Sequence, residues 1–148
     1  MYTLMIIEDG DEYLRFFSRY LDSFVYHQAR SLDDALGLLA EGVVPDVLIL
    51  DLRFDRVPRE VLVGDVEEVA DGMFGGDLEA AVRYTIDNQG YLILQQLRQR
   101  GYAQPALLVA DLPERRQENL RRLYGRIGVV ASFDKSKISE ALRGLLNG

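Results

Sequence analysis

The chain has 148 residues, which is about the size of one compact domain, and 48% of them are apolar, enough to form a buried core. The absence of cysteine excludes a disulfide scaffold, thiolate catalysis and cysteine-ligated metal centres, and a single histidine, His27, excludes a multi-histidine metal site. The net charge of −7 disfavours non-specific binding to nucleic acid, and no apolar run is long enough to span a bilayer.

The first third of the chain alternates apolar runs with segments of helical periodicity. Residues 3–7 and 47–50 form apolar runs of the kind found in strands buried on both faces, and residues 24–29 predict another strand. Apolar spacing predicts one helix over residues 12–21. A second helix is predicted after the capping signature that begins at Ser31, and it ends near Gly42.

The same alternation resumes late in the chain. Strands are predicted over residues 105–110 and 129–133, and helices over 91–100, 114–124 and 138–146. Strands that alternate with helices of about ten residues imply a parallel, doubly wound sheet with helices on both faces. Right-handed crossovers place the carboxyl ends of its strands along one edge, where open sheets of this type bind ligands.

Residues 54–89 interrupt this pattern between the third strand and the third helix. They hold nine acidic residues against three arginines, so they account for −6 of the net charge of −7. A structureless loop of this length is unusual in a compact domain. We therefore expect local structure: a hairpin from residues 60–63 and 66–69, and a helix over residues 77–84.

Three carboxylates are predicted to meet at the carboxyl edge of the sheet. Glu8 and Asp9 follow the first strand, and Asp51 follows the third. Carboxylates crowded in this way repel one another unless a cation lies among them, and hard oxygen ligands suit Mg²⁺. Lys135 follows the last predicted strand and can reach the same edge. A magnesium ion and an ammonium around a carboxylate are suited to phosphoryl transfer, with the carboxylate as nucleophile.

These features resemble the receiver domain of the two-component response-regulator family, which has a flavodoxin-like fold with a five-stranded parallel sheet. The resemblance covers about residues 1–53 and 88–148 and rests on five ordered segments: Met5-Ile6-Ile7-Glu8-Asp9, residues 46–51, residues 90–98, residues 105–110 and Phe133-Asp134-Lys135. It implies one receiver-like domain over residues 1–148 with an insertion at about residues 54–89.

The resemblance also assigns roles to individual residues. It implies that Asp51 is the phospho-acceptor and that Glu8, Asp9 and Asp51 bind Mg²⁺. The main-chain carbonyl of Arg53 would be a further metal ligand, and Lys135 would face the phosphoryl group.

The chain departs from the family pattern at several positions. Ala110 stands where the family has a serine or threonine that contacts the phosphoryl group, and Ser132 stands in place of the switch aromatic, one residue before Phe133. Ser136 replaces the proline that usually follows the lysine, Glu8 replaces a more common aspartate, and the acidic insertion follows Asp51 directly. We therefore expect an atypical receiver in which the usual hydroxyl–aromatic switch cannot operate.

We expect a stand-alone cytoplasmic receiver, phosphorylated on Asp51 by a histidine kinase or phosphotransfer protein and signalling through contacts with an output protein. It would not be an enzyme beyond self-phosphorylation from a phosphodonor and autodephosphorylation. The alternative is a pseudo-receiver, a protein-interaction module that needs no phosphorylation; Ala110 and Ser132 favour it.

Other functions receive less support from the sequence. A magnesium-dependent phosphatase with an aspartyl nucleophile commonly has a second acid two residues later, where this chain has Arg53. No segment is left for a helix-turn-helix, so direct nucleic-acid binding is not expected. The basic helix over residues 114–124 could pair with the acidic insertion of another copy, which makes a homodimer possible.

Overall fold

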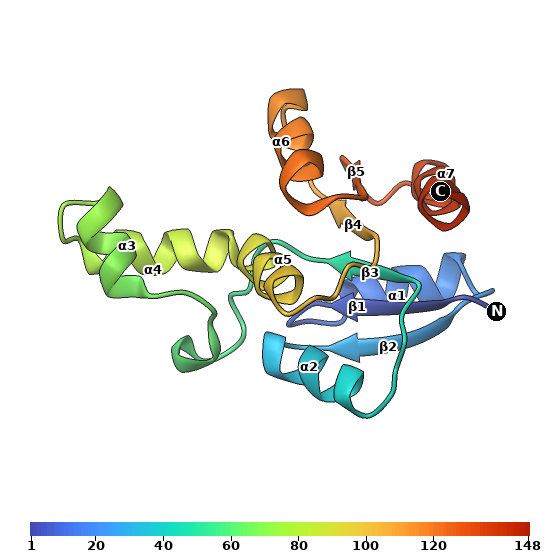
Figure 1. The fold of residues 1–148 in the computed structure, drawn as a ribbon, viewed down its shortest axis with the longest axis horizontal. Helices are drawn as coiled ribbons and strands as arrows, with labels where there is room; N and C mark the ends of the chain where they lie inside the picture. The colour runs from blue at the N-terminus through green and yellow to red at the C-terminus, as the bar shows by residue number, and fades with distance from the viewer.

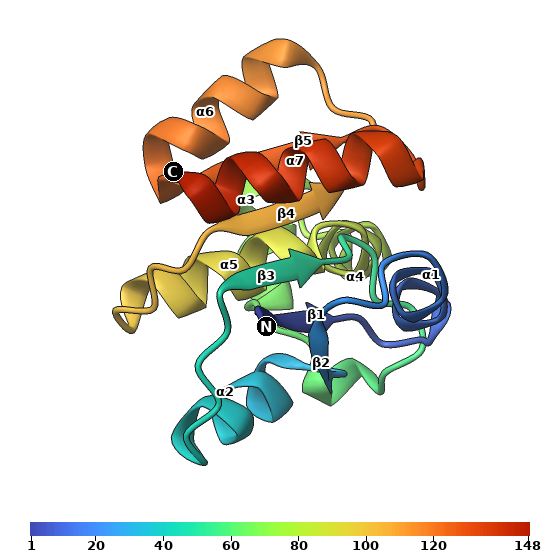
Figure 2. The same cartoon turned by 90° about the vertical axis from the view of Figure 1, so that its right-hand side faces the viewer.

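The computed structural model describes all 148 residues and contains one five-stranded sheet. All strand pairs are parallel and the strand order is β2-β1-β3-β4-β5, as Figure 2 shows from bottom to top. The strands are β1 (Thr3–Ile7), β2 (Val25–Ala29), β3 (Val47–Leu50), β4 (Ala106–Val109) and β5 (Ile127–Val130). The predicted doubly wound, flavodoxin-like fold is therefore confirmed.

Helices cover both faces of the sheet because consecutive side chains of a strand point in opposite directions. Leu4 and Ile6 of β1 belong to the core layer beneath α1 (Glu12–Tyr20) and α7 (Lys135–Asn147). Met5 and Ile7 belong to the opposite core layer, beneath α2 (Leu32–Ala40), α5 (Gln89–Gln99) and α6 (Glu114–Tyr124). None of the helices has the length and apolar character that a bilayer-spanning segment requires.

The segment between β3 and α5 forms two helices that project away from the sheet (Figure 1). A short 3₁₀ turn, η1 (Arg59–Val61), leads into α3 (Val66–Met73) and α4 (Leu78–Asp87). The helix predicted over residues 77–84 is confirmed, but the predicted hairpin is wrong. The reason is that Asp65 does not form a hairpin turn: its side chain accepts a hydrogen bond from the Glu68 N–H at 3.1 Å and so caps α3.

The last strand begins and ends earlier than the predicted range of residues 129–133. Gly125, with a φ of 85°, ends α6, and β5 starts two residues later, paired with β4 from Ala106↔Ile127 to Val109↔Val130. The bounds of β5 are therefore set by its pairing with β4 and not by the apolar content of the sequence. Ser132 and Phe133 consequently lie in the loop between β5 and α7.

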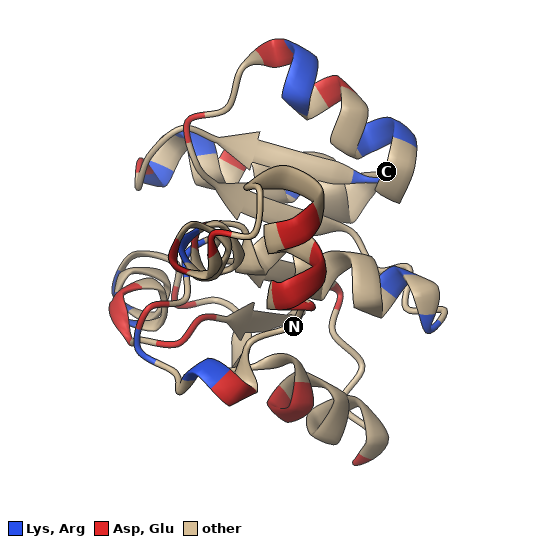
Figure 3. Ribbon diagram, turned by 90° about the vertical axis from the view of Figure 1, so that its left-hand side faces the viewer, with Lys and Arg blue, Asp and Glu red and all other residues tan.

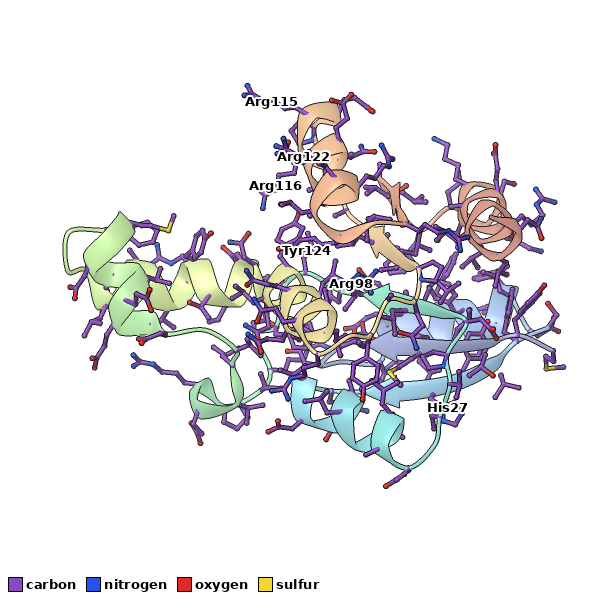
Figure 4. All side chains as sticks on the ribbon, viewed as in Figure 1. His27, Arg98, Arg115, Arg116, Arg122 and Tyr124 are labelled. Carbon is purple, nitrogen blue, oxygen red and sulfur yellow. The ribbon has the colours of Figure 1, made fainter.

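Charge is distributed unevenly over the helices. Figure 3 shows acidic residues on α3 and basic residues on α6, and Figure 4 shows Arg115, Arg116 and Arg122 extending outward from α6. Within α6 the only ion pair joins Arg121 to Glu114, at 3.8 Å. The homodimer suggested by these opposite charges stays a prediction.

The side chain of Gln89, at the start of α5, binds two parts of the segment between β3 and α5. Its amide group accepts a hydrogen bond from the Val63 N–H at 2.6 Å and donates to the Val63 carbonyl at 3.0 Å. The side chain also donates to the carbonyl of Thr85 at 3.2 Å, and Gln89 is only 2% exposed. One buried amide at the start of α5 thus holds the loop before α3 and the end of α4 together.

We expect Gln89→Ala to lower the free energy of unfolding by about 2 kcal/mol, because it leaves buried backbone groups without partners. Urea unfolding followed by circular dichroism measures this loss. Gln99→Ala is the matched control on the exposed end of α5, and it should change stability by less than about 0.5 kcal/mol. Equal effects of the two substitutions would contradict the proposed anchoring.

Candidate functional site

A pocket of about 250 Å³ lies at the carboxyl ends of β1 and β3. The two strands are hydrogen-bonded neighbours, with Ile7 opposite Leu50, so the residues that follow them lie side by side. The pocket is lined by the charged or polar residues Glu8, Asp9, Glu12, Tyr13, Asp51, Arg53, Asp55 and Arg56. Four of the five residues predicted for the site, namely Glu8, Asp9, Asp51 and Arg53, are therefore brought together.

Hydrogen bonds around the pocket hold each of the three central carboxylates. Both oxygens of Glu8 lie within hydrogen-bond distance of the Tyr13 N–H, at 3.1 and 3.2 Å, and Glu8 is only 2% exposed. Asp9 accepts a hydrogen bond from the Arg56 N–H at 2.6 Å. Oδ1 of Asp51 accepts a hydrogen bond from the Tyr13 hydroxyl at 3.3 Å, and the nearby N–H groups of Arg53 and Leu52 act to lower its pKa.

These carboxylates have no cationic partner. Neither Glu8 nor Asp9 nor Asp51 forms an ion pair with a lysine, arginine or histidine. Burial raises the pKa of Asp51 to about 6, and the neighbouring charge of Asp9 adds to this effect. Burial likewise raises the pKa of Glu8 to about 7, with a contribution from Asp51. The pocket therefore concentrates negative charge that its own side chains do not neutralise.

The raised pKa of Asp51 predicts a pH-dependent cost to stability. A carboxyl group with a folded-state pKa near 6 and an unfolded value near 3.9 favours the folded state less as pH rises between these values. Above about pH 6, Asp51 is ionised in the folded state and the full loss of stability is present. Because Asp51 is partly exposed, we expect it to amount to about 1–2 kcal/mol.

Asp51→Asn should therefore raise the free energy of unfolding by about 1–2 kcal/mol at pH 7.5 in EDTA, and by almost nothing near pH 4. Urea titrations at both pH values measure this difference. Asp111→Asn, at an exposed carboxylate in no ion pair, is the control and should show no such pH dependence. A gain for Asp51→Asn that is equal at the two pH values would contradict the assigned cause.

The start of the inserted segment closes one side of the pocket. Besides the bond from its N–H to Asp9, Arg56 pairs through its guanidinium with Glu12 on the first turn of α1, with Nη1 to Oε2 at 2.8 Å. This pairing lowers the pKa of Glu12 to about 2. The inserted segment therefore contacts the candidate site directly, at a position that the sequence alone did not indicate.

Tyr13 belongs to the site, although it was not among the residues predicted for it. Its hydroxyl lies 3.3 Å from Oδ1 of Asp51 and 3.3 Å from the carbonyl oxygen of Val109. Its ring packs edge-on against Phe133 with the centroids 4.8 Å apart, and Phe133 also packs against Phe16. The signal that could have identified Tyr13 is its place on the first turn of the helix that follows the acidic pair, facing the same edge.

Lys135 is the predicted site residue that the structure does not bring into contact with the others. It lies on the exposed first turn of α7, outside the pocket lining and in no ion pair. Because β5 ends at Val130, four residues separate the lysine from the strand. Ala110, whose N–H donates to the Val130 carbonyl at 2.8 Å, supplies no hydroxyl, and Ser132 is exposed.

The oxygen ligands in the pocket could fill only part of the coordination shell of a magnesium ion. No three of the carboxylates are arranged so that they could together hold a metal ion, and both oxygens of Glu8 face the Tyr13 N–H. Mg²⁺, however, is usually held by one or two carboxylates, with water and substrate phosphate completing its octahedron. Asp9, Asp51 and the Arg53 carbonyl offer hard oxygen ligands of this kind. The residues present therefore fit a magnesium ion that keeps several of its waters.

Comparison with protein-family models and with curated protein sequences finds no match. Solved structures do resemble the chain. Chemotaxis protein CheY4 from Vibrio cholerae superimposes with a TM-score of 0.65 at 16% identity, covering 99% of both chains. The response regulator receiver domain protein from Clostridium thermocellum gives 0.64 at 14% identity, covering 99% of this chain and 95% of the other.

A further similar structure is the signal receiver domain of an HD domain-containing protein from Pseudomonas fluorescens Pf-5. Its TM-score is 0.62 at 17% identity, and the alignment covers 99% of this chain and 87% of that one. At these identities the comparison establishes the fold. The chain therefore has the fold of a response-regulator receiver domain, with the helices α3 and α4 between β3 and α5.

Proposed function

We propose that the protein is an atypical response-regulator receiver that accepts a phosphoryl group on Asp51 from a histidine kinase or phosphotransfer protein. The observation that carries the proposal is the group of three carboxylates without ion pairs, in one pocket at the carboxyl edge of the sheet. Such a group favours the binding of a cation next to a potential nucleophile. The output is contact with another protein.

The proposed reaction transfers a phosphoryl group from an imidazole nitrogen of the donor protein to the carboxylate of Asp51. An oxygen of the Asp51 carboxylate attacks phosphorus, the bond between phosphorus and the donor nitrogen breaks, and the donor imidazole takes up a proton. Mg²⁺, held by Asp9, Asp51 and the Arg53 carbonyl, would neutralise charge on the phosphoryl oxygens. Glu8 is the neighbouring carboxylate, and Lys135 must move inward from its exposed position to reach the phosphoryl group.

Tyr13 is expected to respond to phosphorylation. Its hydroxyl is a hydrogen-bond donor beside the oxygen of Asp51, and Ala110, which follows β4, supplies no hydroxyl. Since the Tyr13 ring packs against Phe133, a change at Asp51 has a direct route to an aromatic side chain that is 41% exposed.

A phosphorylation-independent interaction module is the alternative, and a specific observation favours it. The Tyr13 hydroxyl already donates to the Asp51 carboxylate, while Lys135 lies on an exposed turn and forms no hydrogen bond or ion pair with it. Because the Asp51 carboxylate already has a hydrogen-bond partner, the pocket could stabilise the fold without taking part in phosphoryl transfer.

Beryllofluoride, which mimics a phosphoryl group on a carboxylate, distinguishes the two functions. In ¹H–¹⁵N spectra recorded with Mg²⁺, the receiver should show saturable shifts in the loops after β1 and β3 and at Phe133. Asp51→Asn should show none. Spectra of the parent protein that do not change with beryllofluoride would favour the interaction module.

A further inference from the structure

A second cavity lies next to the acidic pocket, on the inserted segment. It has a volume of about 510 Å³, and Arg53 borders both cavities. The other lining residues come from η1 and from one side of α4: Arg59, Leu78, Glu79, Val82, Arg83 and Ile86. We call this cavity the arginine groove. None of the residues predicted from the sequence for phosphoryl transfer lines it except Arg53.

The side of α4 that faces the groove has two parallel rows. Leu78, Val82 and Ile86 follow one another at intervals of four residues and form an aliphatic row. Glu79 and Arg83 form a charged row beside it. The buried Ala81 and Thr85 lie on the adjacent side of the helix. The aliphatic row is less buried than these two residues, and its first member, Leu78, is 47% exposed.

The arginines of the groove have few partners. Arg59 and Arg83 form no ion pair, although the inserted segment contains nine acidic residues. Arg53 makes only long contacts, 3.6 Å to Asp55 and 3.4 Å to Asp87, with its side chain 65% exposed. Three guanidinium groups therefore border one cavity in the most acidic part of the chain, and Glu79 is the only carboxylate that lines it.

We propose that the arginine groove binds a small organic phosphate, a phosphate group attached to an apolar body. Guanidinium groups donate paired hydrogen bonds that match phosphate oxygens, so the arginines would bind the phosphate group. The aliphatic row of α4 would pack against the apolar body of the ligand. The volume lies in the range of small-molecule sites, roughly 300–1,000 Å³. This inference goes beyond the proposed function and does not require Asp51 to be phosphorylated.

Phenyl phosphate is the probe, with inorganic phosphate and phenol as its separate halves. Titrations use the full chain carrying Asp51→Asn and follow ¹H–¹⁵N shifts. EDTA and the substitution prevent the pocket around Asp51 from binding the phosphate through Mg²⁺. We expect saturable shifts at Arg59, Arg83 and the backbone of α4. Phenyl phosphate should bind about tenfold more tightly than inorganic phosphate, and phenol should not bind measurably.

Two sets of variants test the two parts of the groove. Arg59→Gln combined with Arg83→Gln should weaken phenyl phosphate binding by at least about tenfold. Arg115→Gln combined with Arg122→Gln removes the same charge from α6 and should leave binding unchanged (Figure 4). Leu78→Ser, at an exposed position, should weaken phenyl phosphate several-fold without affecting inorganic phosphate.

Three results would overturn the proposal. The first is equal weakening by the two arginine pairs, which would indicate general electrostatic attraction. The second is a set of shifts confined to the loops after β1 and β3, which would place the phosphate elsewhere. The third is binding of an oligoglutamate peptide with no binding of phenyl phosphate, which would make the groove a docking site for acidic protein segments.

Discussion

Replacing Gly90 by alanine is expected to lower the free energy of unfolding by about 3 kcal/mol. Gly90 lies in α5, where its N–H donates to the Leu52 carbonyl at 2.9 Å. A Cβ atom there would lie 2.3 Å from the carbonyl oxygen of Asp51 and 2.9 Å from the Cα of Leu52. These are backbone atoms that no rotamer change can move away. The steric cost therefore exceeds the gain of about 1 kcal/mol that alanine normally brings to a helix.

Gly144→Ala in α7 is the matched control for this prediction. Nothing lies within 4 Å of the Cβ that it would introduce, so only the helix preference acts, and stability should rise by about 0.5–1 kcal/mol. Urea unfolding of the two variants and the parent measures the difference in sign. If Gly90→Ala proved as stable as Gly144→Ala, the close approach of α5 to the backbone of Asp51 would be wrong.

Replacing Asp9 by asparagine is expected to weaken Mg²⁺ binding by about a hundredfold. The substitution keeps an oxygen that can accept the hydrogen bond from the Arg56 N–H, so the loop should keep its conformation. It removes a full negative charge from a pocket whose acidic groups are close enough to raise the pKa of Asp51. Loss of a charged ligand itself should reach the upper end of the tenfold to hundredfold loss of affinity that follows changes around a metal ligand. Isothermal titration calorimetry with MgCl₂ measures the affinity.

Asp11→Asn is the control, because it removes the same charge two residues away. Asp11 pairs with Arg30 at 2.6 Å and does not line the pocket. Its substitution should change Mg²⁺ affinity by less than about threefold. Similar losses for both variants would mean that the surface charge of the loop, and not Asp9 as a ligand, attracts the ion.

The architecture was predictable because its signals are local. Unbroken apolar runs specify β1 and β3 as buried strands, and parallel topology then places Glu8, Asp9 and Asp51 at one edge. The Ser31 cap of α2 was also read correctly, since its hydroxyl accepts from the Asp34 N–H at 3.2 Å. Each of these inferences needs only a few neighbouring residues and the general geometry of parallel sheets.

Features that depend on contacts between distant segments were not predictable. The hydroxyl of Tyr13 meets Asp51 because α1 packs beside β3, and this contact has no sequence signal of its own. Lys135 was placed near the pocket because the last strand was expected to end at residue 133. The pairing of β5 with β4 ends that strand at Val130 and leaves the lysine on an exposed turn.

The inserted segment illustrates both cases. The helix α4 has its own N-cap, Asp77, and was predicted; α3 was mistaken for half of a hairpin because a glycine before Asp65 suggested a turn. The arginine groove depends on how η1 and α4 approach each other. Nothing in the spacing of Arg59 and Arg83 along the sequence indicates that they share a cavity.

The central claim is that Asp51 is a phospho-acceptor, and intact-mass spectrometry tests it most directly. After incubation with acetyl phosphate and Mg²⁺, the parent protein should gain the mass of a single phosphoryl group. Hydroxylamine should remove this group, and peptide mapping should locate it on Asp51. Asp51→Asn, or the parent in EDTA, should gain nothing. A parent protein that stays unmodified, or an Asp51→Asn variant that is modified to the same extent, would contradict the account.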